Sequence, residues 1–159
     1  MATPRPAAGA RSPWVPPDAG YAARVRHSFD RQHAMHLIGA KLTELRPGHC
    51  TIELACREEL TQQHGYVHAG IVSTIADTAG GFAGFTLFPA ESEVLTVEFK
   101  LNLLNPAAGD RLIAIGEVVK PGRTLVITRG EVHADKGGVR TLCAIMQQTL
   151  MVVRAQPKR

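Results

Sequence analysis

Residues 70–87 read GIVSTIADTAGGFAGFTL, a run of apolar and small side chains that carries a single charge, the carboxylate of Asp77. These 18 residues reach the lower limit of length for a membrane-spanning helix. Four glycines argue against a span, and so does the carboxylate, which costs about 2.5–3.5 kcal/mol at the centre of a bilayer. The run therefore predicts a buried central helix, and a helix that is apolar on every side must be covered on every side.

Upstream of this run, the sequence predicts a short helix followed by a β-hairpin. Apolar residues recur at mixed helical spacing over residues 28–41, with Ser28 as a candidate N-cap and Gly39 near the end. Residues 40–45 and 50–56 are short strand candidates, and the Pro-Gly pair between them is a turn signal.

Downstream, the period of the pattern changes to that of strands. Apolar and polar residues alternate strictly over residues 95–103, which is typical of a strand. Turn signals then separate three further strand candidates, at residues 112–119, 124–134 and 141–153. We expect these four strands to follow one another as an antiparallel meander. The sequence thus predicts an α+β domain whose sheet wraps or covers the central helix.

The predicted elements leave surplus apolar surface. The strand over residues 141–153 is apolar on both faces, and one sheet with one helix cannot bury all of it. Burial against a second copy of the chain is the simplest solution, so we expect a symmetric homodimer and no membrane partner.

Length and composition fit one globular domain: 159 residues, 45% of them apolar and 20% charged. The three cysteines form no CxxC pair, so neither a disulfide framework nor a thiolate zinc site is predicted, and a reducing compartment, by default the cytoplasm, fits best. The net charge of +4 comes largely from the chain ends, and no cluster of basic and aromatic residues predicts a nucleic-acid partner. Five of the ten prolines lie in residues 1–20. We therefore expect residues 1–24 to be a disordered leader and residues 25–155 to be a single domain.

Asp77 needs a physical reason for its place in an apolar helix, because desolvation disfavours a charged group. It is either a general base or nucleophile in a cleft, or a structural residue hydrogen-bonded to a neighbour such as Ser73 or Thr74. The residues alone leave both interpretations open.

The polar segment before the helix, residues 62–70 (QQHGYVHAG), offers backbone N–H groups at the positive end of a helix dipole. It is either an oxyanion hole or an ordinary loop that turns at Gly65. His64 and His68 have the spacing of metal ligands on one helix face, but Gly65 would break a helix between them, so no metal is predicted. His68 is then a general base or a partner of the backbone.

Three segments carry a resemblance to a known family: HAGIVSTIADTA at residues 68–79, TVEFKLNLLNPA at 96–107 and VKPGR at 119–123. Together they resemble the PaaI-type (phenylacetic acid degradation) hotdog-fold thioesterases, over about residues 37–153. The resemblance implies a long helix wrapped by a curved antiparallel sheet, two subunits that join their sheets, and an acyl-CoA site at the dimer interface. It also implies no cofactor, and family habit suggests a homotetramer.

The resemblance assigns roles to residues of the motif. Asp77 matches the helix carboxylate that acts as nucleophile or general base on the thioester. The Ala69 N–H matches the amide that polarises the thioester carbonyl, supplied by the opposite subunit. Gln62 matches the Asn or Gln that positions water or the carbonyl, and Thr96 matches a hydroxyl near the catalytic water. His68 completes the expected catalytic set.

Substrate contacts are expected around these groups. The candidates are Gln63, Gly70, Gly81, Lys120 and Arg123. Lys120 and Arg123 lie in the turn that in relatives helps to hold CoA phosphates, although a solvated basic turn has the same composition. Gly81 and its neighbouring glycines either leave room for a bulky acyl chain or permit close packing.

Two positions depart from the family pattern. The usual His-Gly-Gly reads His68-Ala69-Gly70, which keeps the N–H but adds a Cβ that narrows the approach to the carbonyl. Gln62 occurs together with Asp77, whereas the family version with Gln carries Glu.

The expected function is hydrolysis of a small or medium acyl-CoA, aromatic acyl groups included. One alternative is a non-catalytic acyl-CoA binding or sensing module, which would be expected to carry an altered acid or an added DNA-binding helix pair. Another is a hydratase, which would pair Asp77 with His64 or His68. The intact acid favours the thioesterase.

Overall fold

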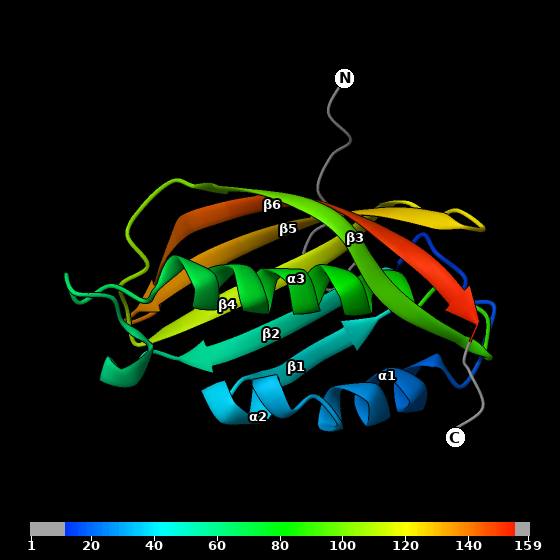
Figure 1. The fold of residues 1–159 in the computed structure, drawn as a ribbon, viewed down its shortest axis with the longest axis horizontal. Helices are drawn as coiled ribbons and strands as arrows, with labels where there is room; N and C mark the ends of the chain where they lie inside the picture. Colours follow the sequence, from blue (N-terminus) through cyan, green and yellow to red (C-terminus); the bar gives the residue numbers. More distant parts are fainter. Residues whose placement is uncertain (1–11, 155–159) are drawn as a thin grey trace.

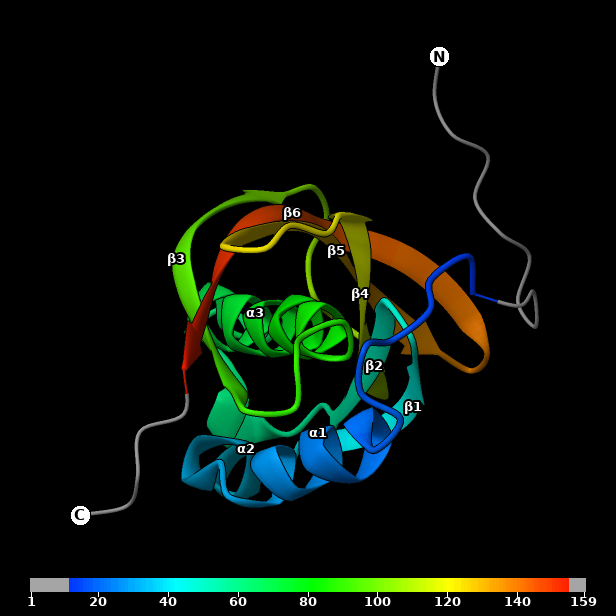
Figure 2. The same cartoon turned by 90° about the vertical axis from the view of Figure 1, so that its right-hand side faces the viewer.

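The computed structural model describes residues 12–154 as a curved antiparallel sheet that holds one long helix (Figure 1). The long helix α3 (Ala69–Phe85) lies against the concave face, while α1 (Tyr21–Asp30) and α2 (His33–Ile38) lie beside β1. The strands are β1 (Lys41–Arg46), β2 (His49–Ala55), β3 (Ser92–Leu103), β4 (Arg111–Lys120), β5 (Leu125–Lys136) and β6 (Val139–Arg154), and a 3-10 turn, η1 (Glu58–Leu60), follows β2. Figure 2 shows the sheet curving around α3. The predicted α+β arrangement is confirmed.

The strand order is β1-β2-β4-β5-β6-β3, so the expected meander is wrong at its first strand. The hairpin β1–β2 and the run β4–β5–β6 pair as predicted, but β3 pairs with β6 rather than with β4. Residues 104–110 make the crossing. The amide of Leu104 donates to the carbonyl of Cys143 within β6, and the amide of Asp110 donates to that of Asp135 near the end of β5. A connection of this length passes two strands, whereas a two-residue turn would have placed β3 beside β4.

A bulge divides β3 into two halves with opposite inward faces. Thr96 contacts α3 before the bulge, whereas Leu101 packs against the core after it. The pairing with β6 shifts between Thr96 and Glu98, so Val97 is the extra residue. The alternation over residues 95–103 predicts one face throughout, and that prediction is wrong, because a slip of one residue moves every later side chain to the other face.

The sheet covers most of α3 but leaves one stripe of it open. Most of the helix after Val72 is buried, and β4 approaches so closely that a Cβ at Gly116 would overlap the helix backbone. Ser73, Thr74 and Asp77 are only half-buried. Within one chain, the expectation of a helix covered on every side is therefore not met. No helix in residues 12–154 is long and apolar enough to cross a membrane.

The single helix predicted over residues 28–41 is two helices in the structure. α1 ends at Asp30 and α2 begins at His33. The apolar residues at mixed spacing therefore belong to two short helices, and each helix turns its own apolar residues toward the core. Ser28 lies inside α1 and is not an N-cap. Gly39 ends α2 with φ +75°, in the left-handed region that suits glycine.

The boundary expected at residue 25 differs from the structure. Trp14 packs against the core, and α1 begins at Tyr21, so packed structure begins within the expected leader. Apolar contacts of Trp14 give this proline-rich stretch a packing partner that its composition does not indicate. Residues 1–11 and 155–159 lie outside the described residues.

Candidate active site

Asp77 lies in the middle of α3, on the stripe that the chain leaves open, and two side chains donate to one oxygen of its carboxylate. Thr96 of β3 donates from Oγ1 to Asp77 Oδ1 at 2.7 Å, and Gln148 of β6 donates from Nε2 to the same oxygen. The hydroxyls of Ser73 and Thr74 donate instead to a carbonyl one turn earlier in the helix. A structural role for Asp77 through those two hydroxyls is therefore not supported.

Gln148 is the residue of this site that the sequence interpretation missed. Its side chain is 1% exposed, and its Nε2 also donates to Thr96 Oγ1 at 3.1 Å and to the Asp77 carbonyl at 3.2 Å. Its Oε1 accepts from Thr128 Oγ1 of β5 at 2.9 Å. The available signal was a glutamine at an inward position between apolar residues of the same face, within the strand predicted over residues 141–153.

The N-terminus of α3 presents one unpaired backbone donor. His68 is the N-cap: its ring Nδ1 accepts from the Gly70 N–H at 2.8 Å, and its carbonyl accepts from the amides of Ile71 and Val72. Within residues 12–154, the Ala69 N–H has no acceptor. It is thus a free donor at the positive end of the helix dipole, where an anionic oxygen is stabilised.

The loop before α3 is closed by its own hydrogen bonds. The Gln62 N–H donates to the Tyr66 carbonyl at 2.8 Å, the Gly65 N–H donates to the Gln62 carbonyl at 2.9 Å, and the turn has φ +82° at Gly65. The Gln62 Oε1 accepts from the His64 N–H. In the single chain, the Gln62 side chain therefore holds the loop and does not reach Asp77.

His64 and His68, which have the spacing of metal ligands, make other contacts in the structure. His64 is exposed, with its Nε2 3.4 Å from the Gln63 side chain, while Nδ1 of His68 is occupied by a backbone amide. Among the described residues, no group of three or more His, Cys, Asp or Glu side chains is placed to hold a metal ion.

A groove of about 490 Å³ lies over the N-terminus of α3. It is lined by Gln62, Gln63, Tyr66, Val67, His68, Ala69, Val72 and residues 103–107. Asp77 does not belong to this lining, because it lies eight residues further along the helix than Ala69, a rise of about 12 Å. One carbonyl group cannot contact both, so within a single chain the amide donor and the carboxylate are two separate half-sites.

The remaining predicted residues lie in two separate regions, along α3 and at the end of β4. Gly70 is exposed beside the groove. Gly81 lies one turn beyond Asp77 on the same face of α3, where a Cβ would meet no atom within 4 Å. Lys120, the last residue of β4, and Arg123, in the β4–β5 turn, are both exposed. They lie at the opposite end of β4 from Arg111, which pairs with the end of β2 that leads into the loop. The structure does not bring these two cations to the groove of their own chain.

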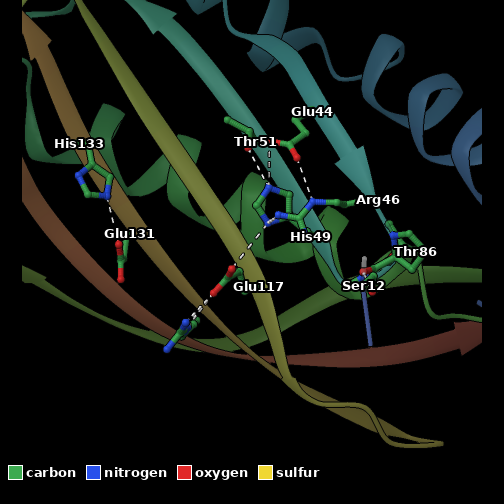
Figure 3. Close-up of polar contacts among 12 residues, drawn as sticks. Ser12, Glu44, Arg46, His49, Thr51, Thr86, Glu117, Glu131 and His133 are labelled. Carbon is green, nitrogen blue, oxygen red and sulfur yellow. Dashed lines mark hydrogen bonds and ion pairs between the residues drawn. The ribbon is translucent and has the colours of Figure 1, made fainter. Parts of the chain in front are cut away.

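A second polar cluster lies on the face of the sheet that points away from α3 (Figure 3). His49 is 5% exposed, and its ring nitrogens lie 3.4 Å from the Glu44 carboxylate and 3.8 Å from that of Glu117. Arg129 pairs with Glu117 at 2.6 Å. Hydrogen bonds from His49 and Arg129 outweigh burial and lower the pKa of Glu117 to about 2. This cluster ties strands together and takes no part in the groove.

Comparisons with known proteins agree on one family. The model described as Thioesterase superfamily matches residues 64–141. A protein of Saccharolobus solfataricus named "Putative esterase" is 31% identical over 121 residues, which are 76% of this chain and 85% of that protein. A solved thioesterase family protein from Silicibacter pomeroyi is 48% identical, with a TM-score of 0.84 over 86% of this chain and 100% of that chain.

The PaaI protein of the E. coli phenylacetic acid degradation operon shares the fold. It is 17% identical, with a TM-score of 0.74 over 87% of this chain and 97% of that chain. At this identity the likeness is one of fold alone. The hotdog fold implied by the sequence resemblance is confirmed, whereas membership of the PaaI branch stays a prediction.

Proposed function

Since the chain belongs to the thioesterase superfamily, we propose that it hydrolyses acyl-CoA thioesters as a PaaI-type member of that family. The observation that carries the proposal is the half-buried Asp77 carboxylate, whose Oδ1 accepts from Thr96 and Gln148. Two donors on one oxygen fix the carboxylate and leave the other oxygen for chemistry.

Asp77 acts as the nucleophile or the general base of the proposed reaction. As general base, Asp77 takes a proton from a water molecule whose oxygen bonds to the thioester carbonyl carbon; the C–S bond then breaks, and that proton passes to the leaving sulfur to give the acid and the CoA thiol. As nucleophile, Asp77 bonds to the same carbon and the C–S bond breaks to release CoA thiolate and leave a mixed anhydride. Water then hydrolyses the anhydride to the free acid and the regenerated carboxylate, and a proton from that water goes to the thiolate. In either route the carbonyl oxygen becomes negative as the C–O bond forms.

The free Ala69 N–H, at the positive end of the α3 dipole, supports a role in stabilising that oxyanion. Thr96 orients the acid, while Gln62 and His68 shape the groove around the carbonyl.

We propose further that the site is completed by a second copy of the chain. The free edge strand β3 carries exposed apolar side chains on both sides of the bulge. They are Leu95, Val97, Phe99 and Leu103, with exposed fractions of 58%, 54%, 47% and 56%. Long apolar edge strands favour pairing. Two β3 strands paired antiparallel about a two-fold axis would bring Asp77 of one copy toward the Ala69 groove of the other, and so close the gap of about 12 Å between the half-sites.

The same pairing supports a CoA-binding role for the basic turn. Lys120 and Arg123 lie at the opposite end of the sheet from the groove of their own chain. A two-fold axis across β3 exchanges the two ends, so these cations would face the groove of the other copy and bind the CoA phosphates there. Gln63 lines this groove and Gly70 is exposed beside it, so both are proposed substrate contacts.

The open space at Gly81 supports an acyl site along α3. A side chain is missing one turn beyond Asp77, and nothing lies within 4 Å of where its Cβ would be. An acyl group attached to a carbonyl at Asp77 would extend into this space. We propose acyl groups of small or medium size, aromatic rings included.

The cysteines support a reducing compartment, and we propose the cytoplasm. Cys50, Cys56 and Cys143 are all free thiols, and burial raises the pKa of each.

The proposal is tested by thiol release from acetyl-CoA, octanoyl-CoA and benzoyl-CoA with the purified protein. Asp77→Asn is expected to lower turnover by about 10²–10⁴-fold, the usual contribution of such a group. Asp30→Asn, an exposed aspartate at the end of α1, is the matched control and should leave turnover unchanged. If no thioester is hydrolysed while CoA esters still bind, the chain is a non-catalytic acyl-CoA binding module instead.

A further inference from the structure

We propose that Gln148 is the positioning residue of this site: with Thr128 behind it, its amide fixes the Asp77 carboxylate in one orientation and leaves Oδ2 as the reactive oxygen. This inference rests on the proposed function, because it assigns the part that a buried side chain plays in presenting the proposed catalytic acid. Gln148 itself does not contact substrate in this scheme, since it is 1% exposed behind Asp77.

Each group around Gln148 can act as donor or acceptor in only one way, so the direction of every hydrogen bond is fixed. An ionised carboxylate only accepts hydrogen bonds, so the NH₂ end of the Gln148 amide must face Asp77 Oδ1. The Oε1 end then faces Thr128, whose hydroxyl must donate. Thr96 accepts from Gln148 through its oxygen and donates its own proton to Asp77. Thr128 thus selects the orientation of the amide, and the amide in turn selects the oxygen of Asp77 that is held.

The carboxylate is consequently asymmetric. Oδ1 accepts from both Thr96 and Gln148, whereas Oδ2 accepts from no group in residues 12–154. Asp77 lies on the open stripe of α3, so the oxygen without a protein partner belongs to a side chain that remains partly accessible. The unheld oxygen is the one left to attack a carbonyl or to take a proton from water.

Packing alone does not explain a glutamine at this position. The inward-facing neighbours on the same strand, Met146 and Leu150, are both buried, and an apolar residue would fill the place without any need for partners. Gln148 instead requires a donor from β5 and acceptors from α3 and β3. Gly80 also has to lack a side chain, because a Cβ there would overlap Gln148 Oε1. Several elements are therefore adapted to one buried amide.

Loss of this amide should lower kcat and leave KM nearly unchanged. Gln148 contacts Asp77 and not the substrate, so its removal frees the carboxylate from the orientation that presents Oδ2, without loss of a substrate contact. A residue that only fills space would change neither kcat nor KM.

The test compares wild type with Gln148→Met, which keeps the length of the side chain, and with Thr128→Val, which leaves Gln148 in place but removes its orienting donor. Gln147→Met is the matched control, because Gln147 is the exposed neighbour on the opposite face of β6. For Gln148→Met we expect a fall in kcat of roughly 10- to 100-fold, the effect of a hydrogen bond to a charged group, with little change in KM. Thr128→Val should lower kcat in the same way but by less, and Gln147→Met should change neither kcat nor KM.

The outcomes separate this inference from the proposed function. If wild type hydrolyses a thioester and both variants fold but keep the wild-type kcat, the role of Gln148 is overturned and the thioesterase stands. If wild type hydrolyses none, the proposed function fails. The positioning role is then read without substrate, from crystal structures in which the Asp77 carboxylate must leave its wild-type orientation in Thr128→Val but not in Gln147→Met. An unchanged orientation in Thr128→Val overturns the positioning role as well.

Discussion

The hydroxyl of Thr96 donates a hydrogen bond of 2.7 Å to the carboxylate of Asp77 across the gap between β3 and α3. The bulge at Val97 makes this contact compatible with the rest of the strand. Without the extra residue, a regular strand would turn Thr96 away from the helix whenever Leu101 faces the core. The bulge therefore lets one edge strand contribute to the apolar core at one end and to the carboxylate at the other.

Replacement of Thr96 separates its hydroxyl from its shape. Thr96→Val removes the donor to Asp77 at nearly constant volume, so we expect kcat to fall by roughly 10-fold, the effect of one hydrogen bond to a charged group. Thr96→Ser keeps the hydroxyl and should retain most of the activity. Steady-state kinetics on the best acyl-CoA substrate measure both, and equal activity of the Val and Ser variants would show that the bond has no catalytic use.

Substitution by alanine is expected to have different effects on activity at two adjacent glycines of α3. A Cβ at Gly80 overlaps the Gln148 amide, whereas a Cβ at Gly81 meets nothing within 4 Å. Both changes to alanine raise helix propensity by about 1 kcal/mol, so this gain is shared and cancels in the comparison. We expect Gly80→Ala to lose activity with every substrate. Gly81→Ala should keep the short acyl-CoA substrates and lose the larger ones.

Chemical denaturation measures the stability of both variants, and a panel of acyl-CoA chain lengths measures which substrates each variant still hydrolyses. A Gly81→Ala variant that handles all chain lengths as wild type does would place the acyl group elsewhere.

A charge on the free edge of β3 should separate the proposed dimer. Phe99 is 47% exposed on that strand, so Phe99→Glu would leave a carboxylate in the paired interface, where its desolvation is unfavourable. We expect a monomer by light scattering and loss of thioester turnover, with the fold intact by circular dichroism. Val139→Glu, at a residue that is 71% exposed in the β5–β6 hairpin, is the matched control and should keep both the oligomer and the activity. An oligomer that survives Phe99→Glu at wild-type mass would mean that another surface joins the copies.

Glu117 should make the stability depend on acid pH. Its pKa falls from the ordinary 4.5 to about 2 in the folded chain, so its stabilising contribution is complete above pH 4.5 and is lost as the pH falls toward 2. A shift of this size corresponds to about 3 kcal/mol. Glu117→Gln is expected to lower the free energy of unfolding at pH 7 and to flatten its decline between pH 4.5 and 2. Urea unfolding across this range measures the effect, with the exposed Glu91→Gln as the control. Parallel declines in the two variants would rule out a special role for Glu117.

Local signals in the sequence were sufficient for most of the elements. The Pro47-Gly48 turn predicted the first hairpin, and the run around Asp77 predicted the central helix within two residues at each end. Periodicity predicts that residues form a strand but does not indicate which other strand pairs with it. The position of β3 beside β6 was therefore not predictable. The bulge at Val97 has no sequence signature that distinguishes it from regular alternation.

The residues of the candidate site likewise differ in how well the sequence predicts them. Asp77 stands out because a charge is costly in an apolar run, and the Ala69 amide stands out because helix N-termini leave donors free. Gln148 does not stand out, since its purpose depends on residues of three other elements that only the folded chain brings together. Polar residues at inward positions of otherwise apolar strands are the pattern to search for in related sequences.

In the proposed dimer, each α3 helix would contribute its acid to one site and its amide donor, about 12 Å away, to the other. Two inactive variants should then complement each other, because a copy without the Asp77 carboxylate still supplies its amide, and a copy with a blocked groove still supplies its acid. Mixed dimers of such chains would regain one of two working sites. Dilution below the dissociation constant of the proposed dimer would abolish activity, so total activity would rise more steeply than in proportion to the concentration of the chain.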